Sequence, residues 1–203
     1  MLIDFRRKWV FVHVPKCAGT SIEQALRQHC DLAVEWPADL WYLERAVEIR
    51  RTLLPNWEEF QSFAVARNPW EWFHSDYHFC RRVWQRCDSP GGLFGEKVAR
   101  AARQSFADFV RHETAGMTCG GIWRYYTWAG DAPLVKSAIR YDCLSEEWPK
   151  LLARLGLPNV ALPRVNVTPR TKAWWRDYTP ELVQLVADAC CAGIAEFGWE
   201  PPL

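Results

Sequence analysis

The clearest pattern in the chain is a short, almost continuous apolar run, followed by a polar loop and then by helical periodicity. Residues 9–14 read Trp-Val-Phe-Val-His-Val, which is typical of a strand buried on both faces in a parallel sheet. Over 18–29 the apolar side chains recur at helical spacing, and Thr20 or Ser21 is placed to cap the first turn. This part of the sequence predicts a strand, a loop and a helix in succession.

A second segment repeats this order. The apolar run 62–66 predicts a strand that leads into Arg67-Asn68-Pro69, and Pro69 suits the first position of a helix running to about residue 86. Apolar spacing and turn residues predict the remaining elements, which are helices over 96–111, 145–155 and 180–197 and a strand within 133–141.

Strands that alternate with helices predict an α/β fold. We expect three layers, α/β/α, around a central and mostly parallel sheet. A length of 203 residues suits one ordinary domain, so the sequence predicts a single domain over 1–203.

Charge and aromatic content narrow the function classes. The chain has 25 Lys and Arg against 24 Asp and Glu, so its net charge of +1 gives no general attraction to nucleic acid or to an anionic membrane. Thirteen tryptophans far exceed ordinary usage. Core packing is the favoured explanation, and an aromatic acceptor pocket is the alternative.

The cysteines and the hydropathy suggest a location. The eight cysteines form no paired Cys-x-x-Cys array, which excludes the usual zinc signature and favours scattered, reduced thiols. No segment approaches the ~20 apolar residues of a membrane span, and the start of the chain lacks a signal sequence. We therefore expect a cytoplasmic protein without a membrane span.

The loop between the first strand and the first helix has the chemistry of an anion site. Backbone N–H groups at a helix N-terminus attract phosphate-like groups, Gly19 allows close approach, and Lys16 adds a positive charge. The lysine precedes the glycine, unlike in the G-x-x-x-x-G-K-[ST] loop of triphosphatases. The predicted anion-binding residues are Pro15, Lys16, Cys17, Ala18, Gly19, Thr20 and Ser21.

Two motifs together resemble a known enzyme family. Residues 11–22, Phe-Val-His-Val-Pro-Lys-Cys-Ala-Gly-Thr-Ser-Ile, resemble the 5′-phosphosulfate loop of the P-loop sulfotransferases, in particular the carbohydrate and heparan sulfate type. Arg67 at a strand end, with Ser75 eight residues on, looks like the family's 3′-phosphate element. The resemblance implies the donor 3′-phosphoadenosine 5′-phosphosulfate (PAPS), the product adenosine 3′,5′-bisphosphate and no metal.

The C-terminal third carries weaker resemblance at 139–144, 166–168, 178–182 and 197–199. A basic loop in this region is expected to fold over the nucleotide, which adds Thr168, Arg170 and Lys172 to the predicted cofactor-binding residues. A solvated charged loop is an equal alternative for any one of them.

The resemblance implies two catalytic tasks. Lys16 would neutralise charge on the leaving phosphate, and a base would take the proton of the acceptor hydroxyl. Relatives commonly place a histidine between the two motifs, but His29, the only one there, has the spacing of a packed helix residue. Glu44 is the first candidate for the base, and His74 or His78 on the next helix ranks below it.

The predicted reaction is sulfuryl transfer to a hydroxyl acceptor, which we expect to be a saccharide. One alternative enzyme is a P-loop kinase-like phosphotransferase, although the triphosphate lysine spacing is lacking. A non-catalytic, Trp-rich sugar-binding protein is the other alternative, and it would leave the phosphate loop without a purpose. The sequence identifies neither the acceptor nor the oligomeric state.

Overall fold

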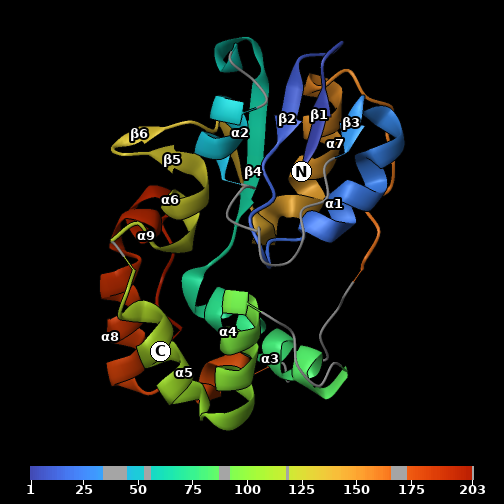
Figure 1. Cartoon of the computed structure of the whole chain (residues 1–203). Helices are drawn as coiled ribbons and strands as arrows, with labels where there is room; N and C mark the ends of the chain where they lie inside the picture. The colour runs from blue at the N-terminus through green and yellow to red at the C-terminus, as the bar shows by residue number, and fades with distance from the viewer. Residues whose placement is uncertain (34–44, 53–55, 87–91, 118, 166–172, 203) are drawn as a thin grey trace. The chain divides into compact units, whose positions relative to one another are not determined.

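The computed structural model describes residues 1–33, 45–52, 56–86, 92–117, 119–165 and 173–202 (Figure 1). The chain divides into two compact units. Unit 1 comprises Met1–Arg67 and Trp123–Val167, and unit 2 comprises Asn68–Ile122 and Thr168–Leu203. The single domain expected over 1–203 stays a prediction.

Unit 1 is built on a five-stranded mixed sheet in the order β3-β1-β2-β4-β7. Its strands are β1 (Leu2–Asp4), β2 (Trp9–Phe11), β3 (Leu32–Ala33), β4 (Gln61–Ala66) and β7 (Ser137–Arg140). β2, β4 and β7 pair in parallel, whereas β1 pairs antiparallel with both β2 and β3. The α/β class is confirmed, but the expectation of a mostly parallel sheet is wrong for the described strands. The two antiparallel strands, β1 and β3, are too short to show a hydrophobic period.

The parallel strands form where the sequence is continuously apolar. All residues of β2 are buried, as are those of β4 except its first, and the rings of Phe11 and Phe63 pack at 5.1 Å. Phe11 lies opposite Phe63, and Ala66 lies opposite Arg140. Because β2, β4 and β7 run in the same direction, the segments that follow them begin at one edge of the sheet.

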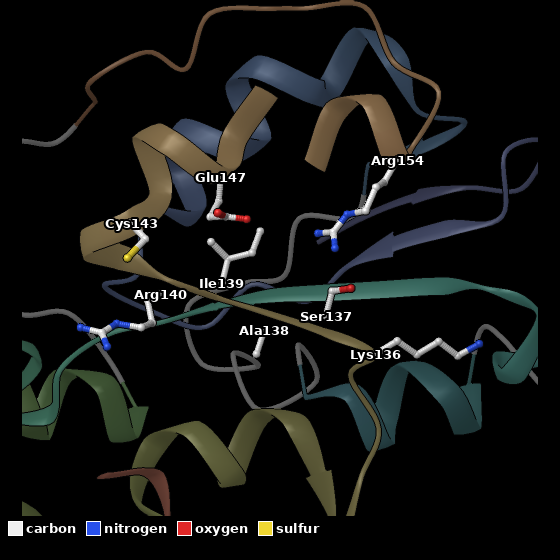
Figure 2. A pocket seen from close by; sticks show the side chains of 8 residues that line it. All are labelled: Lys136, Ser137, Ala138, Ile139, Arg140, Cys143, Glu147 and Arg154. Atoms are coloured by element: carbon white, nitrogen blue, oxygen red, sulfur yellow. The ribbon is translucent and has the colours of Figure 1, made fainter. Parts of the chain in front are cut away.

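Helices lie on both sides of this sheet. The helical and hairpin elements of this part of the chain are α1 (Gly19–Leu26), η1 (Arg27–His29), α2 (Ala46–Thr52), η3 (Trp57–Glu59), α6 (Gly121–Thr127), β5 (Trp128–Ala129), β6 (Ala132–Pro133), η4 (Tyr141–Cys143) and α7 (Leu144–Arg154). The close view in Figure 2 shows α7 on one side of β4 and β7, with the olive α6 on the other.

Unit 2 is helical in its described part. It consists of α3 (Pro69–Arg86), α4 (Gly92–Arg103), α5 (Phe106–Thr114), η5 (Trp174–Asp177), α8 (Pro180–Ala189) and α9 (Cys191–Phe197). Its core cluster is formed by Tyr77, Cys80, Val98, Ala101 and Phe109. Asn68 caps α3, because its Oδ1 accepts from the backbone N–H of Trp70 at 3.1 Å and from that of Glu71 at 3.4 Å.

Two helices that the periodicity predicted as continuous are interrupted. The predicted helix 96–111 is divided by Ser105, whose hydroxyl accepts from the N–H of Asp108 and starts α5. The predicted helix 180–197 is divided at Cys190, where α8 ends and α9 begins. In both places the apolar spacing continues across the break, so periodicity alone could not reveal it.

The tryptophans serve mainly as packing residues in the described part of the chain, as the favoured interpretation held. Those with buried side chains are Trp9, Trp57, Trp70, Trp72, Trp123, Trp148 and Trp199. Two of them also donate from the indole to a backbone carbonyl, Trp57 to Leu134 and Trp70 to Val183.

No helix within the described ranges is long and apolar enough to cross a membrane.

A disulfide joins Cys119 to Cys191 within unit 2. The interpretation of all the cysteines as reduced thiols is therefore wrong for this pair. The adjacent Cys190 is a free, buried thiol, and burial raises its pKa to about 12. Disulfides persist mainly in oxidising compartments, so this bond does not favour the predicted cytoplasmic location, which stays a prediction.

Candidate functional site

The loop that follows β2 has an unusual backbone. Lys16 and Ala18, on either side of Cys17, have φ angles of 64° and 63°, a region that residues with a Cβ seldom occupy. Cys17 is buried and anchors the loop between them. Alternation of this kind turns successive backbone N–H groups toward a common centre, as in the anion-binding loops called nests. The predicted phosphate loop therefore has a backbone suited to an anion.

The helix that follows the loop starts without a side-chain cap. Ala18 is the N-cap residue of α1, and no side chain accepts a hydrogen bond there. The expectation that Thr20 or Ser21 caps this turn is therefore wrong: Thr20 is exposed, and Ser21 Oγ accepts from the backbone N–H of Val165 at 3.2 Å. The first N–H groups of α1 lack the usual partner that a capping side chain supplies, which suits an anion at this end.

Gly19 is required by its contact with His13. A Cβ at position 19 would overlap the imidazole of His13, so no other residue fits there without displacing that ring. The ring is fixed on its other side by a hydrogen bond between His13 Nδ1 and Glu23 Oε1, at 3.1 Å. The glycine thus allows a histidine to lie against the first turn of α1.

Glu23 is the charged anchor of this arrangement. Its carboxylate also accepts from the terminal ammonium group of Met1. Burial alone would raise the pKa of Glu23, but the hydrogen bond and charge of His13, together with the ammonium group of Met1, lower it from 4.5 to about 2. The carboxylate therefore stays ionised in the folded protein at all but very acidic pH.

We expect Glu23→Gln to lower the free energy of unfolding by about 3 kcal/mol near neutral pH. Because the folded pKa lies below the unfolded one, this stabilisation is complete above about pH 4.5 and is lost as the pH falls toward 2. Urea unfolding at several pH values measures it. Glu59→Gln, which removes an exposed partner of Lys8, is the matched control and should change little. If Glu23→Gln lowered the free energy of unfolding equally at pH 7 and at pH 2, this explanation would be contradicted.

Arg67, which follows β4, supports the loop directly. Its Nη1 donates to the backbone carbonyl of Lys16 at 2.7 Å, and its guanidinium lies 4.3 Å from the ring centre of Tyr141, which follows β7. The side chain is buried. The ends of three parallel strands thus meet at one place: the loop after β2, Arg67 after β4 and Tyr141 after β7.

The other predicted site residues fall in two groups. Ser75 and His74 lie on α3 in unit 2, and both are buried. The rest, Glu44, Thr168, Arg170 and Lys172, lie outside the described residues.

His74 belongs to a compact group in unit 2. Its Nε2 lies 3.0 Å from Asp177 Oδ2 and 3.1 Å from His78 Nε2, so three potential ligand atoms face one another. His78 is half-buried, and its burial, followed by the nearby His74, lowers its pKa. Asp177 is half-exposed and opens the group to solvent.

A shallow groove of about 460 Å³ lies along β7 and α7 in unit 1 (Figure 2). Figure 2 shows Lys136 and Arg140 at opposite ends of β7, with Glu147 and Arg154 from α7 beside the strand. The lining includes none of the residues that the sequence predicted for the site. Its lining carries three cationic side chains and one carboxylate, that of Glu147, and Arg140 is paired with Asp142.

Sequence reasoning missed several residues of these arrangements. His13 lies inside the string that resembles the family loop, so its position was a signal, although no role was given to it. Tyr141 lies inside the weaker resemblance at 139–144, although no role was given to it. Asp177 carried no such signal, since it reaches His74 only through the fold. The spacing of His74 and His78, one helical turn apart, was a further signal, but it indicated a base and not a group of ligands.

Comparison of the chain with protein-family models, with curated proteins and with solved structures found no match.

Proposed function

We propose that this chain is a sulfotransferase that moves the sulfuryl group of PAPS to a hydroxyl acceptor, with a saccharide as the first acceptor class. The observation that carries the proposal is the loop after β2, held by Arg67 through the carbonyl of Lys16. A P-loop sulfotransferase fold, with helices on both sides of a central sheet, is part of the same proposal. The mixed five-stranded sheet is compatible with it.

The loop supports binding of the 5′-phosphosulfate end of the donor. The left-handed residues at 16 and 18 and the start of α1 together provide backbone N–H groups and the positive end of a helix dipole. Lys16 adds a full charge from within the loop. These groups recognise an anion by its charge and by several hydrogen bonds, which fits a sulfated phosphate.

Arg67 supports the binding of a second phosphate near the same edge of the sheet. A buried guanidinium that braces the loop and stacks on Tyr141 is held in one orientation. We propose that it also contributes its charge to the 3′-phosphate. Ser75, in unit 2, and Thr168, Arg170 and Lys172, outside the described residues, remain predicted contributors.

The chemistry requires in-line geometry and charge neutralisation. The acceptor oxygen forms a bond to sulfur while the bond from sulfur to the bridging phosphate oxygen breaks. Lys16 stabilises the negative charge that gathers on the leaving phosphate, and Glu44 is the proposed base for the acceptor proton. His74 is the second candidate for that role. The donor is already activated, so the proposal assigns no step to a metal ion.

A transfer assay tests this function. The chain is incubated with PAPS labelled in the sulfuryl group and with a panel of hydroxylated acceptors, saccharides first. The proposal predicts label in an acceptor and an equal amount of adenosine 3′,5′-bisphosphate. Label that stays in the donor with every acceptor class would contradict the proposal, as would transfer of phosphate from ATP.

We expect Arg67→Gln to weaken the binding of adenosine 3′,5′-bisphosphate about a hundredfold, or nearly 3 kcal/mol. The substitution removes a charge and leaves the Lys16 carbonyl without its guanidinium donor. Calorimetry measures the change, and circular dichroism checks the fold.

The matched control is Arg51→Gln, since Arg51 is an exposed arginine of the same unit that pairs with Glu48 and not with the loop. Unchanged nucleotide affinity in the Arg67 variant would remove this residue from the proposed site. An equal loss in both variants would show only a general effect of charge.

A further inference from the structure

The group formed by His74, His78 and Asp177 has the arrangement of a metal site. The two histidines occupy successive turns of α3, four residues apart, and so project from the same face of that helix. Asp177 ends η5, and its carboxylate reaches His74 Nε2 at 3.0 Å. Two separate elements of unit 2 thus bring two imidazoles and a carboxylate together.

The distances between the ligand atoms fit a bound cation. His74 Nε2 lies 3.0 Å from the Asp177 oxygen and 3.1 Å from His78 Nε2, and the three ligand atoms lie within 4.8 Å of one another. Ligands that bind zinc at about 2.0 to 2.1 Å in a tetrahedron lie roughly 3.3 Å apart. A single ion therefore fits among these atoms with little movement.

Hydrogen bonding alone satisfies this group poorly. One nitrogen, His74 Nε2, faces both a carboxylate oxygen and the Nε2 of His78, but it carries at most one proton. If His74 Nε2 donates its proton to Asp177, His78 Nε2 must either accept that same proton or direct its own N–H toward the N–H of His74. A cation would accept lone pairs from all three atoms at once.

The surroundings are those of a partly open site. His74 is buried and is packed by the rings of Phe106 and Trp174, with ring centres 5.7 and 6.3 Å away. Such packing fixes the orientation of a ligand. The Asp177 side chain is 50% exposed, which leaves room for water at the remaining coordination position. The guanidinium of Arg81 donates to the hydroxyl of Tyr77 at 3.0 Å, and its positive charge also lowers the pKa of His78.

We propose that His74, His78 and Asp177 bind one divalent transition-metal ion of the zinc type, with solvent completing its coordination. Two neutral imidazoles and one carboxylate are a ligand set that such ions prefer. None of these three residues belongs to the phosphate loop, which lies in unit 1. If His74 holds an ion through Nε2, that nitrogen cannot serve as the base in sulfuryl transfer, which leaves Glu44 as the candidate.

Metal titration of the full chain tests this site. The chain is first treated with a chelator and dialysed, and it is then titrated with ZnCl₂ by calorimetry and with CoCl₂ by visible spectroscopy. We expect one equivalent to bind, with the cobalt bands of nitrogen and oxygen ligands and without thiolate charge-transfer bands. We also expect Zn²⁺ to raise the thermal midpoint of unfolding.

The test variants are His78→Gln and Asp177→Asn, because these side chains are less buried than His74 and their replacement threatens the fold less. Each should weaken zinc binding at least about tenfold and remove the cobalt bands. His112→Gln, which changes an exposed histidine of α5, should leave both signals unchanged. Absence of zinc binding in the parent chain, or binding that survives in both variants, would overturn the proposal.

Discussion

Replacing Lys16 with Ala is expected to lower the rate of sulfuryl transfer at least about a thousandfold while the stability stays nearly the same. The lysine is the only side chain within the loop that brings a full positive charge to the proposed leaving phosphate. Removing one such stabilising group costs about 4 kcal/mol in the transition state. The stability should change little because alanine also carries a Cβ and occupies φ 64° with the same strain as lysine.

Lys8 provides a matched control for this experiment. It is also a lysine with positive φ, 55°, in the same unit, but it lies in the turn between β1 and β2, at the opposite end of β2 from the loop. Its ammonium group pairs with Glu59 at the surface. The Lys8→Ala variant should transfer the sulfuryl group at the same rate as the parent chain. Turnover that persists in Lys16→Ala would show that Lys16 lacks the proposed role.

Removing the disulfide is expected to lower the free energy of unfolding by roughly 4 kcal/mol. Cys119 and Cys191 are separated by 72 positions, and the crosslink restricts the unfolded chain accordingly. A backbone hydrogen bond also joins the two segments next to the disulfide, since the N–H of Ala192 donates to the carbonyl of Cys119 at 3.1 Å. Urea unfolding of Cys119→Ser and Cys191→Ser, without reductant, measures the effect.

Two observations separate this effect from a general effect of losing a cysteine. Cys30→Ser changes a free thiol in unit 1 and should leave the unfolding midpoint almost unchanged. The raised pKa of Cys190 keeps that thiol protonated, so it should not replace Cys191 as the partner of Cys119. A midpoint in Cys191→Ser equal to that of the parent chain would contradict a stabilising crosslink.

The fold could be predicted from the sequence where local signals agree. The strand before the loop, the strand at 62–66 and the start of α3 at Pro69 were predicted because apolar runs and a proline mark them. The break at Ser105 was missed because apolar spacing continues through it. The antiparallel pairing of β1 was missed because three residues cannot show a period.

The candidate site could be predicted only in part, for a related reason. The phosphate loop is local in sequence, so its residue types and its place after a strand were readable. The contact of Arg67 with the Lys16 carbonyl spans 51 positions, and that of His74 with Asp177 spans 103. Such contacts depend on how strands and helices pack. Gly19 also has a reason that the sequence did not show, since its missing Cβ makes room for the ring of His13.

The most direct test of the central claim is calorimetry of the full chain with adenosine 3′,5′-bisphosphate in buffer without divalent ions. The proposal predicts binding at one site with micromolar affinity. A chelator should leave this affinity unchanged, and replacing either Lys16 or Arg67 should weaken it. Neither Lys16 nor Arg67 is a ligand of the proposed metal site, and the chelator shows whether nucleotide binding depends on a bound ion. Binding that requires ATP and magnesium, or the absence of any nucleotide binding, would contradict the account.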